Sequence, residues 1–442
     1  MVVKLEEAVV VINMKKLTFI FVLFSVLNAF AQTQESDSLN TYKKRVLEST
    51  EIDFLMSYYN QEGDHAAVSG GIGSEKLIDI TPTFVISVPL NSDDVLTVDA
   101  GISAYSSASS SNIDPFDSKD PANPYNESSG ASMSDVWVNG NFGYSHSSDD
   151  RNQIIGANLS VASEFDYFSI GAGVNYTRLF NKKNTEVSVK ANVFLDTWNP
   201  QYPIELREGF SNPDIVGPGV YNPFKFSEFD KLGRNSYSLS LSFSQILSKN
   251  LQASVFVDFV LQDGLLSTPH QRVYFQDQPD FFIDYFQLAD DVERLPDSRF
   301  KVPIGTRINY FINERFTLRT YYRFYFDDWG VISNTINLEL PFKITDKFTI
   351  YPIYRYYTQT AADYFAPYEM HTSTEEFYTS DYDLSQFHSN QLGFGFNYTD
   401  IFTSFNIWKL GLKSFDFRYG NYNRSDGLTA NIFSVGFKFL LD

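Results

Sequence analysis

The sequence predicts an all-β protein: a transmembrane, antiparallel up-and-down β-barrel of about 16 strands that follows a cleaved signal peptide. Three observations lead to this fold class. Aromatic residues make up 17% of the chain, although its mean hydropathy is −0.23 and its formal net charge is −20. Apolar and polar residues alternate with period two over segments of about ten residues, the span of a tilted transmembrane strand. Short and long connections between these segments also alternate along the chain.

The N-terminus has the pattern of an export signal. The stretch that begins at Met14, MKKLTFIFVLFSVLNAFAQ, places two lysines before an apolar run and contains the small-residue motif AFA at 29–31. This order is typical of a cleaved secretory signal peptide. We therefore expect a leader and signal peptide over 1–31, a short periplasmic segment over 32–49 and an outer-membrane β-barrel over 50–442.

Each expected strand carries apolar residues on one face and polar residues on the other. Between Arg315 and Asp328, Phe324 and its apolar neighbours two residues away alternate with Arg319 and Arg323. This order fits a sheet between two media, lipid outside and water inside, and an even strand number is usual for bacterial outer-membrane barrels. The expected strands start near Thr50, Leu77, Val95, Asp135, Gln153, Phe168, Thr185, Ser236, Leu251, Arg299, Glu314, Val331, Phe348, Asn390, Lys413 and Ala430.

The connections between the expected strands fall into two sets. One set consists mostly of short polar turns, such as LSKN and INER. The other set holds all the large loops, over 105–133, 197–235, 262–298 and 358–389. In outer-membrane barrels the short turns face the periplasm and the long loops face the exterior. The two sets therefore predict an orientation as well as a topology.

The charged residues expected to face inward are segregated along the chain. The first nine strands contribute mostly acidic side chains, and the last seven contribute mostly basic ones. A transverse field across a watery channel would orient and select polar or anionic solutes, whereas cross-wall salt bridges would brace or fill the lumen. The sequence leaves both interpretations open. The candidate lumen and selectivity residues are Arg307, Arg319, Arg323, Arg355, Arg418, Asp99, Asp258 and Glu339.

Motifs for other chemistries are weak. No two of the five histidines share a strand face at metal spacing and the chain has no cysteine, so we expect no metal site and no cofactor. The dipeptide His388–Ser389 is a remote candidate for a barrel hydrolase, but it needs a third, orienting group. We therefore predict no enzyme activity and no catalytic residues. The acidity of the chain argues against nucleic acid as a partner.

Six stretches of the chain carry a family resemblance: GGIGSEKL (70–77), STPHQRVYF (267–275), ERLPDSRFKVPIG (293–305), RTYYRFYFDDWG (319–330), YRYYTQTAADYFAPY (354–368) and RYGNYNRSDGL (418–428). Together they resemble an uncharacterised family of Gram-negative outer-membrane-type proteins, domain of unknown function 3570. The resemblance covers nearly the whole chain after the signal peptide. It implies export and a barrel, and it implies no activity, substrate or catalytic residue.

Two classes of function follow from these expectations. The leading hypothesis is an outer-membrane pore or transporter for small polar solutes, which it selects by the charge of the lumen. The alternative is a non-conducting scaffold or receptor whose long extracellular loops bind a partner; large loops that are folded inward and packed would favour it. The expected partners are outer-membrane lipid and lipopolysaccharide, the barrel assembly machinery during biogenesis, and a small polar solute.

Overall fold

The computed structural model describes residues 43–106, 135–223 and 225–441. The predicted signal peptide and most of the predicted segment 32–49 lie outside the described residues. From Val46 onward the described residues belong to one compact unit, the β-barrel and its connections. No helix in the described ranges is long and apolar enough to cross a membrane.

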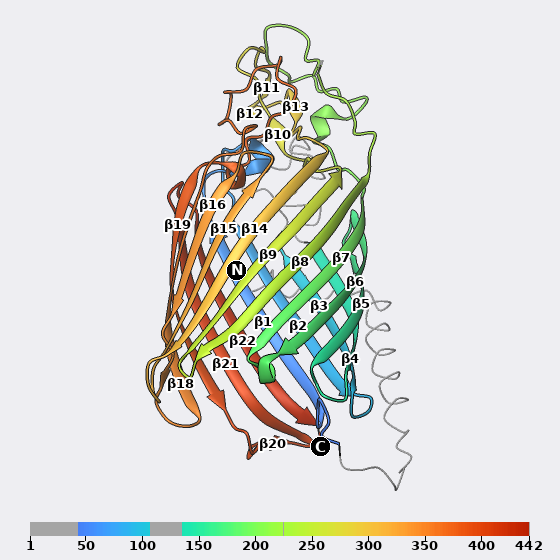
Figure 1. Ribbon diagram of the computed structural model, residues 1–442. Helices are drawn as coiled ribbons and strands as arrows, with labels where there is room; N and C mark the ends of the chain where they lie inside the picture. Colours follow the sequence, from blue (N-terminus) through green and yellow to red (C-terminus); the bar gives the residue numbers. More distant parts are fainter. Residues whose placement is uncertain (1–42, 107–134, 224, 442) are drawn as a thin grey trace. The chain divides into compact units, whose positions relative to one another are not determined.

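Sixteen long antiparallel strands form the wall of the barrel (Figure 1). They are β1 (Thr50–Glu62), β2 (Leu77–Pro89), β3 (Asp94–Tyr105), β4 (Asp135–Ser147), β5 (Gln153–Ser163), β6 (Tyr167–Phe180), β7 (Thr185–Trp198), β8 (Gly233–Ser248), β9 (Leu251–Gly264), β14 (Ser298–Phe311), β15 (Thr317–Asp327), β16 (Ile332–Glu339), β18 (Phe348–Gln359), β19 (Phe387–Thr399), β21 (Leu410–Arg424) and β22 (Thr429–Leu441). Two short strands, β17 (Phe342–Lys343) and β20 (Asn406–Ile407), extend the same sheet at its short-turn end. The predicted fold class is confirmed, and each strand starts within three residues of its expected position.

The sheet closes on itself. β1 pairs with β22 in an antiparallel register that runs from Thr50 opposite Leu441 to Glu62 opposite Thr429. Closure removes the two edge strands that an open sheet would leave, so the wall has no row of unpaired backbone groups. A closed barrel is the arrangement of strands that satisfies its backbone in hydrocarbon.

The outer face of the wall is apolar. Leu159, Val174, Leu392 and Phe394 are each more than half exposed, at 63%, 60%, 65% and 52%. They come from β5, β6 and β19, and other large apolar side chains repeat the pattern around the barrel. A continuous apolar surface of this extent is matched to lipid rather than water. The dyad pattern in the sequence therefore describes an outward face for lipid and an inward face for the lumen.

The long connections fold together at one end of the barrel into a body that we call the cap (63–76, 199–232, 265–297 and 360–386) (Figure 1). Its secondary structure is sparse. Four short strands pair as β10 (Arg272–Val273) with β13 (Asp291–Val292) and β11 (Phe282–Ile283) with β12 (Phe286–Gln287). Three one-turn 3-10 helices are η1 (Ala67–Ser69), η4 (Ile204–Leu206) and η5 (Tyr382–Leu384), while η3 (Asn181–Lys183) is a turn at the opposite end.

The cap has a hydrophobic core of its own. Leu206, Tyr274, Ala289 and Val292 form one buried cluster, and Phe281, Ile283, Phe286 and Leu288 form another. The ion pair between Arg272 Nε and Glu205 Oε1, at 2.6 Å, is buried among them. Arg272 Nη1 also donates to the carbonyl of Val68 at 3.0 Å, which joins the β1–β2 connection to the rest of the cap. The cap segments that the structure describes are thus packed against one another.

Candidate functional site

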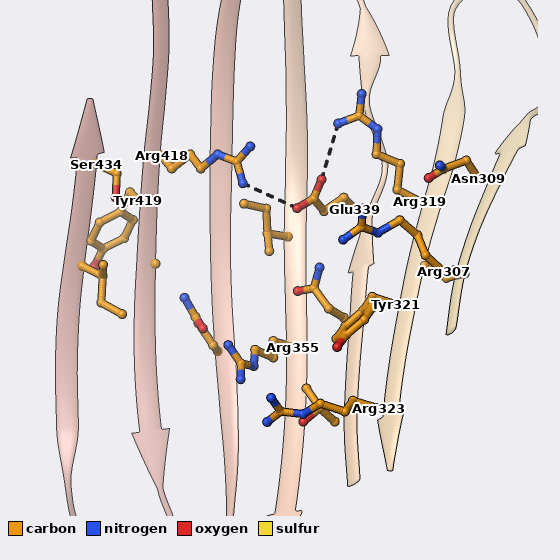
Figure 2. Close-up of a pocket in the computed structure, with 17 residues that line it drawn as sticks. Arg307, Asn309, Arg319, Tyr321, Arg323, Glu339, Arg355, Arg418, Tyr419 and Ser434 are labelled. Atoms are coloured by element: carbon orange, nitrogen blue, oxygen red, sulfur yellow. Dashed lines mark ion pairs between the residues drawn. The ribbon is translucent and has the colours of Figure 1, made fainter. Parts of the chain in front are cut away.

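A cavity of about 780 Å³ lies inside the barrel, against the inner faces of β14, β15, β16, β18, β19, β21 and β22 (Figure 2). Its lining is dominated by arginine. Six of the eight candidate residues identified from the sequence come together in this lining: Arg307, Arg319, Arg323, Arg355, Arg418 and Glu339. Five arginines against one glutamate leave an excess of four positive charges in the lining. The alternation of the strands explains this gathering, because every second residue of each strand points inward.

The strand register brings these side chains side by side. On β15 and β16, Arg319 lies opposite Glu339 and Arg323 lies opposite Thr335. On β14 and β15, Arg307 lies opposite Tyr321. Directly opposite residues have Cβ atoms about 4.5–5.5 Å apart, so their side chains can interact. Residues from different strands thus become neighbours on the inner surface of the wall.

Glu339 is shared between two arginines. Its carboxylate lies 3.6 Å from Arg319 Nη1 and 3.7 Å from Arg418 Nη1 (Figure 2). Arg418 also donates from Nε to Asp416 Oδ1 at 3.0 Å. In the described part of the chain, these ion pairs remain within the β14–β22 half and none joins the arginines to an acid of β2–β9. Among the described residues, no acid on the opposite side of the barrel neutralises these arginines.

Water reaches this part of the lumen. The side chains of Arg319 and Arg418 point inward, yet 51% and 46% of their surfaces remain exposed. Arg307 lies over the rings of Phe256 and Tyr321, with its guanidinium carbon 5.6 and 5.9 Å from the ring centroids. Aromatic faces of this kind hold a guanidinium in place without neutralising it. The cavity is therefore wet, positively charged and partly preorganised.

The other two candidate residues lie apart from this cavity. Asp99, on β3, accepts a hydrogen bond from Asn141 Nδ2 at 2.9 Å. Asp258, on β9, lies opposite Ser240 of β8. Neither contributes to the cavity lining. The structure thus leaves these two acids outside the cavity that the arginines line.

Acidic and basic halves meet at the seam where the barrel closes. Lys438 Nζ lies 2.9 Å from Glu51 Oε2 and 3.2 Å from Asp53 Oδ2. Lys413 Nζ lies 2.7 Å from the other oxygen of Glu51. Salt bridges therefore brace the β1–β22 junction, while the arginine cavity keeps most of its charge. The salt bridges at the seam join neighbouring strands, and a field that selects solutes stays a prediction.

Sequence reasoning missed the uncharged polar residues of the cavity. Thr335 and Asn337 on β16, Asn309 on β14 and Gln391 on β19 also line it. The candidate residues identified from the sequence were all charged, although inward tyrosines such as Tyr321 were also expected. The same alternation that places Glu339 inward also places Thr335 and Asn337 inward, so the signal was present in the pattern. Hydroxyl and amide groups add directional donors and acceptors to the arginine field.

The candidate sites for other chemistries are not assembled. His388 and Ser389 are consecutive residues of β19, so their side chains point to opposite faces of the sheet. His388 is exposed, whereas Ser389 is 2% exposed. Within the ranges that the structure describes, no group of three or more His, Cys, Asp or Glu side chains could hold a metal ion.

Comparisons with known proteins add a family. The model of a family with the description "Protein of unknown function (DUF3570)" matches residues 21–432. No curated protein matches the chain. Among solved structures, a bacterial polysaccharide outer membrane secretin is 10% identical, covers 89% of this chain and 99% of its own, and has a TM-score of 0.42. Pseudomonas aeruginosa OccK1 (OpdK) is 8% identical, covers 89% of this chain and 99% of its own, and has a TM-score of 0.37. Vibrio cholerae OmpT lacking loop L8 is 8% identical, covers 88% of this chain and 100% of its own, and has a TM-score of 0.37.

Proposed function

We propose a function from the residues of the barrel itself. The chain belongs to the family described as protein of unknown function (DUF3570), and this description names no activity. The protein is an outer-membrane pore or transporter for small polar solutes, and its lumen favours anions. The observation that carries this proposal is the wet cavity lined by five arginines and one glutamate.

The positive charge of the cavity supports selection of anions over cations. Arginine stays protonated at every physiological pH, so the field of the cavity is permanent. A unit charge about 4 Å from an ion contributes about 1 kcal/mol even in bulk water, and more beside a low-dielectric wall. Salt screens such charges over about 10 Å at 0.1 M, a distance comparable to the scale of a narrow lumen. Several unpaired arginines therefore act together on one passing ion.

The outer surface of the barrel supports a location in the outer membrane. The exposed apolar face requires hydrocarbon, so outer-membrane lipid surrounds the barrel and lipopolysaccharide contacts it in the outer leaflet. The short turns face the periplasm, and the cap faces the exterior. A barrel of this type reaches its membrane with the help of the barrel assembly machinery.

Charge reversal at two cavity arginines tests the proposal. The double variant Arg319→Glu/Arg323→Glu leaves three arginines and three glutamates in the lining, so their formal charges cancel. Wild-type channels in planar bilayers should prefer anions in a salt gradient. The double variant should lower the anion-to-cation permeability ratio by about fivefold or more, the equivalent of about 1 kcal/mol.

Lys249→Glu serves as the matched control, because it reverses an exposed charge in the β8–β9 turn, outside the cavity. It should leave the permeability ratio close to that of the wild type. Equal ratios in the wild type and the double variant, or a wild type that never conducts, would exclude the pore.

The cap favours a second candidate, a non-conducting scaffold or receptor whose extracellular body binds a partner. Its specific support is the core built by the large loops, which exceeds what a loose channel mouth needs. The same bilayer recordings separate the two candidates. A folded, membrane-inserted wild type without conductance would favour the receptor over the pore.

A further inference from the structure

We infer that Arg323, Arg355 and Thr335 form a recognition site for a carboxylate group, so that the solute taken up by the lumen is a small organic acid. This inference rests on the proposed function and names the class of solute for the same cavity. All three residues line the cavity. They come from three consecutive strands of the wall, β15, β18 and β16.

The register places two arginines on either side of one strand. Arg323 of β15 lies opposite Thr335 of β16, and Arg355 of β18 lies opposite Asn337 of β16. Thr335 and Asn337 are both inward residues, two positions apart. Figure 2 shows the side chain of Arg323 extending toward Arg355. The two guanidinium groups therefore flank a short stretch of wall that carries a hydroxyl and an amide.

These two arginines differ from Arg319 and Arg418 in their partners. Arg319 and Arg418 share Glu339, and Arg418 also has Asp416. Among the described residues, neither Arg323 nor Arg355 has an ion-pair partner. Arg355 is exposed to the lumen, so a dissolved anion can reach it directly. Together with Arg307, which lies over two aromatic rings, Arg323 and Arg355 carry the positive charge that no acid among the described residues offsets.

Two buried polar atoms in this group have no hydrogen-bond partner in the described part of the chain: Arg323 Nε and Thr335 Oγ1. Thr335 is 2% exposed. A buried donor left unpaired costs about 1–3 kcal/mol, and native proteins keep few such groups. Arg323 and Thr335 both line the cavity, and we expect a rotation of the arginine side chain on binding to turn its Nε edge toward the lumen and to uncover the threonine. An acceptor there would satisfy both atoms.

The shape of the donors selects the kind of anion. The edge of a guanidinium presents two parallel N–H groups, whose spacing matches the two oxygens of a planar carboxylate. The hydroxyl of Thr335 supplies a third donor, and the exposed guanidinium of Arg355 supplies the first attraction from solution. The amides of Asn337 and Gln391, in the same lining, can bind polar groups on the remainder of the solute. A neutral solute would leave the charged donors unsatisfied.

Calorimetric titration of the purified full chain in detergent tests this site with sodium propanoate as the probe, and with sodium sulfate and glycerol as comparisons. Propanoate should bind more tightly than sulfate, and glycerol should not bind. Thr335→Val removes one donor without changing the shape of the side chain, and should weaken propanoate binding by about tenfold or more. Arg323→Lys keeps the charge but loses the fork of donors, and should weaken binding by a similar factor.

Two variants outside the cavity serve as matched controls. Thr317→Val lies on the inward face of β15, and Arg315→Gln lies just before it. Both should bind propanoate as the wild type does. Unchanged propanoate binding in Thr335→Val and Arg323→Lys, or sulfate binding that is as tight as propanoate binding, would overturn the carboxylate site.

The bilayer recordings keep this inference separate from the pore. Anion-selective conductance without any propanoate binding would retain the pore and remove the site. Propanoate binding that Thr335→Val weakens, in a barrel that does not conduct, would retain the site and remove the pore.

Discussion

At the scale of single residues, the outer face shows how polar groups are tolerated beside lipid. Tyr322 donates to Asn334 Oδ1 at 2.7 Å, and both residues point outward from neighbouring strands. Two further pairs of this kind occur, Tyr354 with Asn390 at 2.9 Å and Tyr419 with Asn431 at 2.8 Å. A hydrogen bond across the strands satisfies groups that hydrocarbon would otherwise leave unpaired.

The substitution Phe324→Arg tests the register of β15. Phe324 lies opposite Ile304 of β14 and its ring is 6.0 Å from that of Phe326, so it belongs to the outward set. An arginine facing lipid near the midplane costs about 2–4 kcal/mol, and we expect the variant to fail to assemble in membranes. Arg323→Ala, one residue away and inward, should assemble. Heat-modifiable migration on gels reports folding, and a fully folded Phe324→Arg would show that the register is wrong.

At the scale of elements, the strands could be predicted from the sequence and the cap could not. A strand is recognised from adjacent residues in the sequence, because its alternate side chains face different media. The cap is built from pairs that are far apart in the chain, such as Glu205 with Arg272, or Lys225 Nζ with the carbonyl of Ser373 at 2.6 Å. Such contacts leave no local periodicity. Large loops could be expected from the lengths of the connections, but their shared core could not.

The buried acids of the cap make its stability depend on pH. Burial, together with the nearby Asp381 carboxylate, raises the pKa of Glu293 to about 8. Burial also raises the pKa of Asp290 to about 7. Glu293 accepts hydrogen bonds from Thr379 Oγ1 and from the backbone of Thr268. The folded cap therefore favours the protonated form of these carboxyl groups.

We predict that the cap loosens as the pH rises. Because the folded pKa of Glu293 lies above its ordinary value of 4.5, the stabilisation is complete below about pH 4.5 and is lost as the pH rises through about 8. Local opening, measured by hydrogen exchange of cap amides and corrected for intrinsic rates, should increase by up to about tenfold per pH unit in this window.

Glu293→Gln should make the dependence shallower, because the amide does not titrate whereas Asp290 still does. Glu376→Gln, at an exposed position of the same cap, is the control and should keep the dependence of the wild type. Opening that does not change with pH in the wild type would contradict the assignment of Glu293.

At the scale of the whole molecule, one rule accounts for the fold and for most of the site. Alternation predicted the closed barrel, the number of strands and the inward position of Arg307, Arg319, Arg323, Arg355 and Arg418. It could not tell which inward residues lie at the same height, because that depends on register. Asp99 and Asp258 were expected on the acidic half of the wall, and the structure leaves both outside the arginine cavity. Register also produced the pairing of Arg323 with Thr335.

The central claim is that the outward face of the wall meets lipid while its inward face meets water. The chain has no cysteine, so single cysteines can be placed at each residue from Leu318 to Phe326 and spin-labelled. In lipid bilayers, accessibility to dissolved oxygen should peak at Thr320, Tyr322, Phe324 and Phe326. Accessibility to a water-soluble nickel chelate should peak at the alternate positions, including Arg319 and Arg323. Nickel access at every position, or at none of the inward ones, would contradict a membrane barrel with a wet lumen.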